Sequence, residues 1–472
     1  MTIRIVTATV PGSMGTVDYT HADIVDWDNG GLAIFLVSGN TALGTEGGRT
    51  AISIVSSGAE SGLLAGRALQ GASNVPHNCA GIHTQATATI RVIDDDQLPG
   101  AGTWALATTP VALSNGVQLN WTDVSGVAGR TFRIVCILID GLSNVDMATG
   151  AGSAIGFEPD GVLALGFSGS VGGASTTIAN HFQAAFGAAI NGGGQCAGAV
   201  AWEANDDPAT ADSIVRTDRL SIDYEASTDS ETGSAVSAFT ATGFTETGTG
   251  GRIFAAYKFT DDIPTAVAVE ELSGNGTQGF TGLGITPALI FGIVTGNETT
   301  GSAESGAARS RCAYFVSDGT NTYSISASQR HTGTLIAAGN LTACSSHYSA
   351  SAIECLDHLG AVDFSATVTS LDASGFTLDV TNAMDGRMVV WAIGLGDQVI
   401  VQEESVSISE GSVLLEYQTL IVNETVTISE GDPLFMEQDA TLDEPTRGNT
   451  SQGGAMKGVT AQGGAAYGHT SS

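Results

Sequence analysis

Two groups of cysteine and histidine residues are close enough together in the chain to suggest a metal site. The first group is His77, Cys79 and His83, and the second is Cys344, His347, Cys355 and His358. Thiolate and imidazole ligands suit tetrahedral zinc. Neither spacing is that of a recognised zinc finger, however, and an internal repeat described below aligns Cys355 with Tyr224 of an apolar strand. We therefore expect no zinc, and we expect free thiols that pack as small apolar side chains.

The segment DWDNGG brings three oxygen-bearing side chains together, those of Asp26, Asp28 and Asn29. Carboxylate and amide oxygens on a turn are ligands that calcium prefers. The same residues also favour a water-exposed turn closed by its own Asx side chain, which needs no metal. The sequence leaves calcium open at this position and predicts no other cofactor.

Exposed aromatic side chains could form a platform on which a sugar stacks. The tryptophans of the chain are Trp27, Trp104, Trp121, Trp202 and Trp391. Trp121 and Trp391 lie in or beside apolar strand-like segments, so we expect them in the core. Trp27, between two acidic residues, is the one expected to be exposed.

Recognisable catalytic motifs are missing from the sequence. It has no nucleophile elbow, no phosphate-binding loop, no dinucleotide fingerprint and no HExxH segment. Aspartates are numerous, but no pair stands in a context that singles out an acid and a base. We therefore expect no catalytic residues and no enzymatic activity. A polysaccharide hydrolase, which needs two carboxyl groups roughly 5–10 Å apart in a groove, stays open as an alternative.

The elements that would position these residues recur three times along the chain. The apolar segments LAIFLVSGN, VLALGFSG and LIFGIVTGN each end in Ser or Thr followed by a glycine, namely Gly39, Gly169 and Gly296. Later in each repeat a Gly-Arg pair opens a second apolar segment, with Arg130, Arg252 and Arg387. Matching markers in matching order indicate an internal triplication.

Each repeat is expected to consist of β-strands. The segment SATVTSLDASGFTLDV alternates apolar and polar residues, as a strand does when one face is buried. Only residues 176–190 have some helical periodicity. We predict an all-β fold with three tandem, related antiparallel β-sandwich domains over residues 1–150, 151–272 and 273–396, with a jelly roll as one candidate topology.

The C-terminal segment has a composition and a repeat of its own. Residues 397–446 contain twelve acidic side chains and no lysine or arginine, and the motifs VSISEG and VTISEG stand twenty residues apart. Val406, Ile408, Val426 and Ile428 alternate with polar residues, which predicts two half-buried strands within residues 397–432. Two strands alone are marginal in water, so we expect an arm that adds to a neighbouring subunit, with folding back onto the third repeat as the alternative. Residues 433–472 are a polar tail, rich in Gly, Ser and Thr, that cannot build a core.

Net charge excludes two classes of partner. The chain carries 49 acidic and 16 basic residues, a formal charge of −33, which argues against binding to nucleic acid or to an anionic membrane.

No apolar run approaches the ~18–20 residues that span a bilayer, so no membrane insertion is expected. The first residues, MTIRIVTATVPGSMG, do not resemble a signal peptide, and we expect synthesis in a cytoplasm without classical export.

The organisation as a whole resembles that of tailed-bacteriophage virion structural proteins, of the tail-fibre, tail-spike or capsid-decoration type. The GFTL-type and VTISEG-type segments are the most specific local features of this resemblance. It implies a structural component of the virion, made in the host cytoplasm, whose partners are further copies of itself in a homo-oligomer and other virion proteins. The alternative from a different class is a carbohydrate-binding adhesin that recognises a host-surface glycan.

Overall fold

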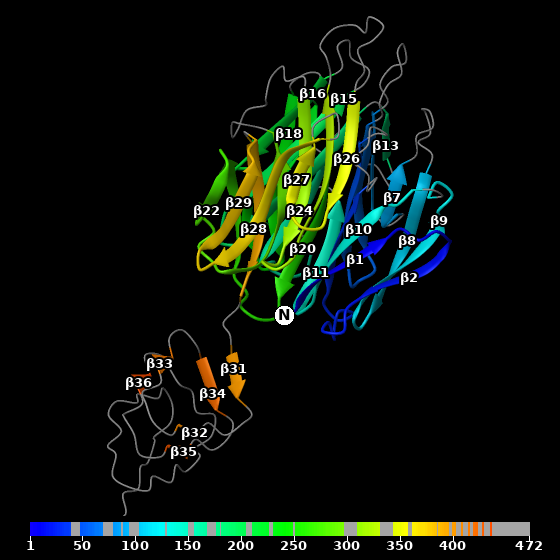
Figure 1. Cartoon of the computed structure of the whole chain (residues 1–472). Coiled ribbons are helices and arrows are strands. Elements are labelled where there is room, and N and C mark those ends of the chain that lie inside the picture. The colour runs from blue at the N-terminus through cyan, green and yellow to red at the C-terminus, as the bar shows by residue number, and fades with distance from the viewer. Residues whose placement is uncertain are drawn as a thin grey trace, which may run out of the picture. The chain divides into compact units, whose positions relative to one another are not determined.

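Every regular element that the structure describes is a β-strand, so the predicted all-β class is confirmed (Figure 1). The structure is a computed structural model of the whole chain. It describes residues 1–38, 48–68, 79–85, 88–93, 103–127, 130–149, 155–167, 176–179, 181–203, 210–225, 230–248, 251–296, 309–330, 343–356, 361–384, 386–395, 399–402, 407–408, 414–415, 419–422, 427–428 and 435–436. Over these ranges no helix is long and apolar enough to cross a membrane.

Unit one, as we name the first group of strands, contains ten of them in two sheets. They are β1 (Ile3–Thr9), β2 (Gly15–Thr20), β3 (Leu32–Ser38), β4 (Gly48–Ser56), β5 (Ser61–Ala68), β6 (Cys79–Gln85), β7 (Ile90–Ile93), β8 (Thr103–Leu113), β9 (Gly116–Asp123) and β10 (Arg133–Ile139). The large sheet has the order β1-β10-β3-β4-β5-β6, and the small sheet has the order β2-β9-β8-β7. All pairings within both sheets are antiparallel.

Unit two repeats this plan with a smaller second sheet. Its strands are β11 (Leu142–Thr149), β12 (Gly161–Phe167), β13 (Thr176–Ala179), β14 (His181–Ile190), β15 (Gln195–Glu203), β16 (Thr210–Arg216), β17 (Ser221–Glu225), β18 (Ser230–Thr240), β19 (Gly243–Gly248) and β20 (Gly251–Phe259). The large sheet runs β11-β20-β12-β14-β15-β16 and the small sheet runs β17-β18-β19. Strand β13 instead pairs with β6 and extends the large sheet of unit one.

Unit three has the same two-sheet plan as unit one. Its strands are β21 (Thr265–Leu272), β22 (Gly276–Phe280), β23 (Pro287–Thr295), β24 (Arg309–Ser317), β25 (Thr322–Arg330), β26 (Ala343–Ser349), β27 (Ile353–Leu356), β28 (Val362–Asp372), β29 (Gly375–Asn382) and β30 (Gly386–Gly394). The large sheet runs β21-β30-β23-β24-β25-β26 and the small sheet runs β22-β29-β28-β27. In each large sheet the second strand in the order, β10, β20 or β30, is therefore the last strand of its unit.

By strand pairing, unit two begins at β11 and unit three begins at β21, a few residues before the boundaries expected from the sequence. Residues 1–394 nevertheless form one compact unit, which we call the body. The ranges 1–150, 151–272 and 273–396 stay predictions as separate domains.

Burial explains which segments are apolar throughout and which alternate. Strand β3 is buried along its whole length, because Phe35 and its alternate neighbours face the small sheet while Ile34 and its alternate neighbours face the other units. A strand buried on both faces reads as a continuous apolar run. Strand β29, in a small sheet, alternates instead, since only one of its faces is covered.

The same reasoning corrects the helical periodicity of residues 176–190, which form β13 and β14. The alanine-rich β14 is buried on both faces, so its sequence needs no alternation of apolar and polar residues.

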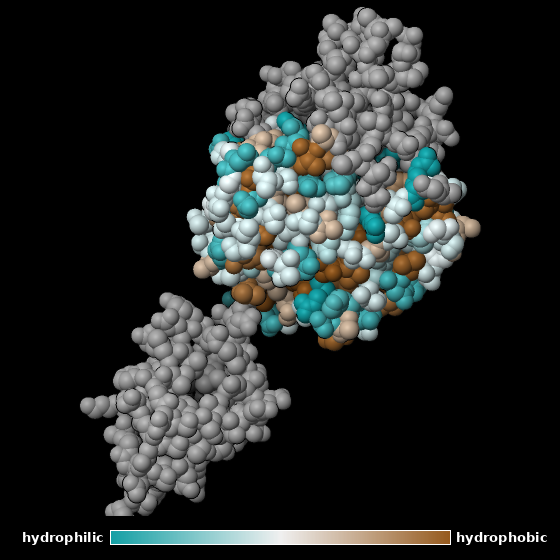
Figure 2. Space-filling view, in the orientation of Figure 1, coloured by the Kyte–Doolittle hydropathy of each residue, from teal (hydrophilic) through white to brown (hydrophobic). Residues whose placement is uncertain are grey.

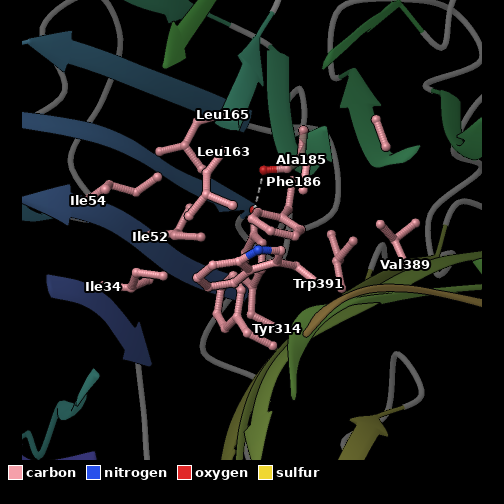
Figure 3. Packing of buried hydrophobic residues seen from close by; sticks show 14 of the residues in the cluster. Ile34, Ile52, Ile54, Leu163, Leu165, Ala185, Phe186, Tyr314, Val389 and Trp391 are labelled. Atoms are coloured by element: carbon pink, nitrogen blue, oxygen red, sulfur yellow. Dashed lines mark hydrogen bonds between the residues drawn. The ribbon is translucent and has the colours of Figure 1, made fainter. Parts of the chain in front are cut away.

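The three large sheets enclose one hydrophobic core that belongs to no single unit. Leu32, Ile34 and Leu36 of unit one, Leu163 and Leu165 of unit two, and Leu289, Phe291 and Ile293 of unit three all belong to it. Figure 3 shows this centre, with side chains of Ile34, Ile52 and Ile54 approaching those of Leu163, Phe186 and Trp391. Separate cores fill the space between the large and the small sheet of each unit.

The units meet through one kind of contact, repeated in cyclic order. Strands β5 and β6 of unit one contact β14 of unit two, β15 and β16 of unit two contact β24 of unit three, and β25 and β26 of unit three contact β4 of unit one. Because β4, β14 and β24 hold the same place in their sheets, the same two surfaces meet each time. A heterologous contact that closes after three steps is the geometry of a three-membered ring. In this chain the three members are covalently joined.

The C-terminal unit, residues 395–472, contains three pairs of short parallel strands. They are β31 (Val399–Gln402) with β34 (Thr419–Val422), β32 (Ser407–Ile408) with β35 (Thr427–Ile428), and β33 (Leu414–Leu415) with β36 (Phe435–Met436). The first two pairs join residues exactly one sequence repeat apart, such as Ile408 and Ile428. The described strands β34, β35 and β36 thus pair, in this order, with β31, β32 and β33.

Candidate functional site

The junction of units two and three is built from buried aromatic side chains. Trp391 of β30 donates a hydrogen bond from Nε1 to the hydroxyl oxygen of Tyr257 in β20, at 2.9 Å, and the two rings are 5.6 Å apart. Phe186 of β14 meets Phe291 of β23 edge to face at 4.8 Å. Burial raises the pKa of Tyr257 far above its ordinary value, so this hydroxyl stays neutral at any physiological pH. These contacts hold units two and three together.

Two polar side chains that enter the shared core find partners across the same junction. The hydroxyl of Tyr314 in β24 donates to the carbonyl oxygen of Ala185 in β14 at 3.3 Å, as the dashed line in Figure 3 indicates. The thiol of Cys196 in β15 donates to the carbonyl oxygen of Ala268 in β21 at 3.6 Å. Burial raises the pKa of Cys196 to about 12, so it is an inert packing thiol rather than a nucleophile.

The junction of units three and one closes the ring. The chain does not pass directly from unit three to unit one, so only noncovalent contacts join them here. Tyr323 of β25 and Tyr348 of β26 stack with ring centroids 6.4 Å apart, and both are half-buried against the shared core. The guanidinium carbon of Arg133, at the start of β10, lies 5.9 Å from the centre of the Tyr348 ring, a cation–π distance. This aromatic and cationic contact joins unit three to unit one and so closes the ring.

The junction of units one and two places two carboxylates near one another. The backbone amide of Met147 in β11 donates to Oε2 of Glu60 at 3.2 Å, and Glu60 lies in the β4–β5 turn of unit one. Burial raises the pKa of Glu60, and the adjacent Asp146 carboxylate raises it further against that hydrogen bond. Burial also raises the pKa of Asp146. The native fold therefore favours the protonated form of both groups.

Ion pairs connect the large sheet to the small sheet inside two of the units. In unit two Arg216 of β16 binds Glu231 of β18, and in unit three Arg311 of β24 binds Asp363 of β28. A second bridge in unit three runs from Nε2 of His347 in β26 to Oε2 of Glu354 in β27, at 3.0 Å. The hydrogen bond from His347 holds the pKa of Glu354 below its usual range.

The proposed calcium residues lie on an exposed turn ahead of β3. The backbone amide of Asn29 donates to the carbonyl oxygen of Asp26 at 3.1 Å, and Nδ2 of Asn29 donates to Oδ1 of Asp26 at 2.5 Å. The turn is thus closed by its own Asx side chains, and Asp28 is exposed to solvent. Calcium at Asp26, Asp28 and Asn29 stays a prediction. Across the described part of the chain, no three His, Cys, Asp or Glu side chains gather where they could hold a metal ion.

The two cysteine and histidine groups are described only in part. In the second group His347 binds Glu354, while Cys355 is fully buried in β27. Tyr224, the aligned residue of unit two, is fully buried in β17, which confirms a packing position for Cys355. The side chains of the first group, and those of Cys344 and His358, lie outside the described residues. Cys136, Cys196, Cys312 and Cys355 are free and buried, as expected.

Trp27 corrects the expectation from its acidic neighbours. Trp121 and Trp391 are buried, as predicted, but Trp27 is also completely buried, although Asp26 and Asp28 on either side are exposed. Its ring packs over Gly31, where a Cβ atom would overlap the indole, and it joins the core between the two sheets of unit one. The turn alternates like a strand, with the acidic residues outward and the tryptophan inward.

Two of the sequence markers are misaligned. Leu36 and Ile293 face the shared core three residues before Gly39 and Gly296, whereas in unit two the corresponding core residue, Leu165, stands four residues before Gly169. The marker of unit two is therefore out of register by one residue, a shift that exchanges the two faces of a strand.

The arginine marker of unit one is wrong as well. Arg130 precedes β10. Arg252 and Arg387 each stand second in β20 and β30, but they are out of register by one residue, because Phe254 belongs to the core of unit two whereas Val389 faces the shared core. Arg133 is the residue of unit one that is followed by the same alternation as Arg387: Val135 and Val389, each two residues further on, both face the shared core. Arg130 therefore lies ahead of the strand, which starts three residues later at Arg133.

The proposed assembly residues lie in the C-terminal unit. Ile408 is in β32 and Ile428 is in β35, and the two are paired with each other in parallel. Val406 and Val426 lie outside the described residues. Among the described residues, Ser407–Ile408 of the first repeat therefore pairs with Thr427–Ile428 of the second. The addition of these strands to a neighbouring subunit, and their folding back onto the third repeat, stay predictions.

The residues that build the three junctions were not found by sequence reasoning. Tyr257, Trp391, Tyr314 and Tyr348 carry no motif, and their partners are more than a hundred residues away in several cases. The available signal was the continuous apolar character of the large-sheet strands, which indicates a second buried face. Models of known protein families and curated protein sequences give no match to this chain.

Proposed function

We propose that this protein is a structural component of a bacteriophage virion, in which the body is a preassembled three-membered β ring and the C-terminal unit is the attachment element. The observation that carries the proposal is the cyclic contact of β5, β15 and β25 and their neighbours around one shared core. Symmetric protein shells and fibres are built from closed rings of identical subunits. Here one chain supplies a whole ring with a fixed composition.

The charged and polar side chains of the body make contacts within the fold, as expected of a structural protein. The side-chain donors of Tyr314, Cys196 and Trp391 make hydrogen bonds between units. The ion pairs Arg216–Glu231 and Arg311–Asp363 join sheets. Each of these groups stabilises the fold and is therefore not poised to act on a substrate. On this proposal the protein is not an enzyme.

The surface of the body also agrees better with a structural protein than with a sugar-binding protein. Figure 2 shows apolar residues scattered among polar ones over the described surface. Among the residues that the structure describes, the exposed large apolar side chains are Met14, Val25, Val111 and Leu395. Single apolar residues of this kind are normal and mark no binding site. The buried state of Trp27, Trp121 and Trp391 removes three candidates for a sugar-stacking platform, so we place the adhesin alternative second.

Location in the virion, homo-oligomer formation and contacts with other virion proteins are parts of this proposal. It is tested by purifying particles from a host that expresses the chain together with its genome of origin, and by mass spectrometry of the particles. We expect the full chain in stoichiometric amount in the particles, and we expect a chain lacking residues 395–472 to fold but to be left in the lysate. A full chain that folds and is present in the lysate, yet is missing from purified particles, overturns the proposal.

A further inference from the structure

Four asparagines of this chain are followed directly by a glycine, a sequence in which the asparagine side chain can react with the backbone. They are Asn29, Asn115, Asn191 and Asn275. In such a pair the backbone nitrogen of the glycine attacks the side-chain amide carbon, and glycine has no Cβ atom to hinder the approach. All four pairs lie in described parts of the body, so their surroundings can be compared.

The reaction has two steps and needs only water. In the first step a bond forms between the glycine nitrogen and Cγ of the asparagine, and the bond from Cγ to the amide nitrogen breaks. Ammonia leaves, carrying the proton of the glycine N–H. In the second step water opens the five-membered succinimide ring at either of its two carbonyl groups. The product is therefore aspartate or isoaspartate, and isoaspartate has one more methylene in its backbone.

Two of the four asparagines are held by hydrogen bonds from their side-chain amides. Nδ2 of Asn29 donates to Oδ1 of Asp26 at 2.5 Å. Nδ2 of Asn191 donates to Oε1 of Glu158 at 3.1 Å and to the carbonyl oxygen of Pro159 at 3.2 Å. In both cases Cγ reaches the next backbone nitrogen only when these bonds break, which costs free energy and slows the reaction.

The pair of Asn115 and Gly116 is held by its backbone. Gly116 is buried at the start of β9, and it pairs with Thr20 of β2 on one side and with Leu113 of β8 on the other. A Cβ atom at Gly116 would overlap the carbonyl oxygen of Tyr19. Ring closure rotates the backbone at the asparagine–glycine bond, and a glycine enclosed on both sides in a sheet resists this rotation.

Asn275 stands in a different setting, in the short connection between β21 and β22. Its side chain is exposed, and it has a glycine on either side. Gly274 has a φ of 69° and Gly276 a φ of 102°, and in the described part of the chain nothing lies within 4 Å of a Cβ atom built at either one. Gly276 is the first residue of β22, which stands at the end of the strand order of its sheet. The backbone here can therefore rotate with little resistance.

The residues ahead of Asn275 are held, so this freedom is local. Nε2 of Gln278 donates to the carbonyl oxygens of Ser273 and Gly274, the second at 2.7 Å. The backbone amide of Ser273 donates in turn to Oε1 of Gln278 at 3.3 Å. The groups that are held precede Asn275, whereas the bond that must rotate follows it.

We propose that Asn275 is a site of spontaneous deamidation in the folded protein, where it turns into a mixture of aspartate and isoaspartate, while the fold protects the other three asparagine–glycine pairs. The reaction is irreversible, so the converted fraction records the age of the chain. It adds one negative charge to an exposed turn, and the isoaspartate form lengthens the backbone ahead of β22. This inference goes beyond the proposed function and needs no partner molecule.

Incubation of the folded full chain tests the inference. The protein is kept in mildly alkaline buffer made with heavy-oxygen water, which labels each amide lost during the incubation. Cleavage after lysine and arginine places the four asparagines in separate peptides, 5–49, 92–130, 134–216 and 259–309, for mass spectrometry. We expect Asn275 to react at least about tenfold faster than each of the other three, with isoaspartate among its products. Equal rates at Asn275 and another pair, or aspartate without isoaspartate, would overturn the proposal.

The unfolded chain shows whether the fold makes the difference. In concentrated urea the four pairs should react at rates within about threefold of one another, because each then has the same flexible asparagine–glycine backbone. An advantage of Asn275 that persists in urea would come from its neighbours in the sequence, and the inference would be wrong.

Variants of the full chain locate the reaction. Asn275→Gln should remove the mass gain of peptide 259–309, because a glutamine must close a larger ring; a gain that persists would place the reaction at Asn297 of the same peptide and contradict the assignment. Asp26→Ala removes the acceptor of the Asn29 amide and should speed the reaction at Asn29 several-fold, with Asn275 unchanged. An unchanged rate at Asn29 would refute protection by the side-chain hydrogen bond.

Discussion

The indole nitrogen of Trp391 donates a buried hydrogen bond to the hydroxyl oxygen of Tyr257, 134 residues earlier in the chain. The two residues occupy the last strands of units three and two, and both belong to the core that the three large sheets share. This single bond therefore reports on whether units two and three are packed together.

Removing the Tyr257 hydroxyl, which accepts this hydrogen bond, should lower the stability of the body. In Tyr257→Phe the indole N–H of Trp391 is left buried without this partner, so we expect the free energy of unfolding to fall by about 1–3 kcal/mol. Denaturant unfolding measures the change, and Tyr323→Phe, at a half-buried tyrosine, serves as the control with a smaller expected effect. The double variant Tyr257→Phe/Trp391→Phe should cost less than the sum of the single variants, because the two groups interact. Strictly additive losses would contradict the bond.

A close backbone approach inside unit two gives a second test. A Cβ atom at Gly187 of β14 would overlap the carbonyl oxygen of Leu220, just ahead of β17, where the large and small sheets of this unit touch. We expect Gly187→Ala to lower the free energy of unfolding by about 1–3 kcal/mol, since the sheets must move apart. Gly12→Ala is the matched control, because nothing lies within 4 Å of a Cβ atom there. Equal thermal stability of the two variants would show that the sheets are not in contact at Gly187.

The bridge between His347 and Glu354 predicts a loss of stability in acid. The hydrogen bond from His347 lowers the pKa of Glu354 in the folded state below its unfolded value. A carboxyl of this kind stabilises the fold above its unfolded pKa of about 4.3, and this contribution disappears as the pH falls through the folded pKa. Wild type should thus exceed Glu354→Gln in stability near pH 6 and approach it near pH 3, as urea unfolding at each pH will measure. A difference that is independent of pH would rule out this linkage.

Glu60 predicts the opposite dependence at the junction of units one and two. Burial, and the neighbouring Asp146, raise the pKa of Glu60 in the folded state. The fold therefore favours its protonated form, and stability present below the unfolded pKa of about 4.3 is lost as the pH rises through the folded pKa. In Glu60→Gln, whose amide oxygen can still accept from Met147, we expect higher thermal stability than wild type at pH 7. The advantage should vanish near pH 4; an advantage that grows in acid would contradict this assignment.

Much of the architecture could be predicted from local pattern. Alternation in residues 362–382 identified strands with one buried face, and the apolar segments before Gly39 and Gly296 identified further strands. The repeats were visible because turn glycines and apolar runs recur in the same order. Register was less secure, since a shift of one residue, as at Gly169, changes the face of every side chain while leaving the composition of the segment the same.

The sequence by itself determined that this protein is made of β-strands in three similar sets, followed by an acidic repeat. Only the tertiary structure decided what covers the second face of each large sheet. It assigned Trp27 to a core that its acidic neighbours in the chain do not reveal, and it placed Trp391, which was expected in a core, against Tyr257 of another unit. It also paired Ile408 with Ile428 in parallel, where the same alternation was equally compatible with a neighbour's sheet. The physical reason is that alternation records how many faces of a strand are buried, a local property, whereas the partner on each face is set by contacts between residues far apart in the chain.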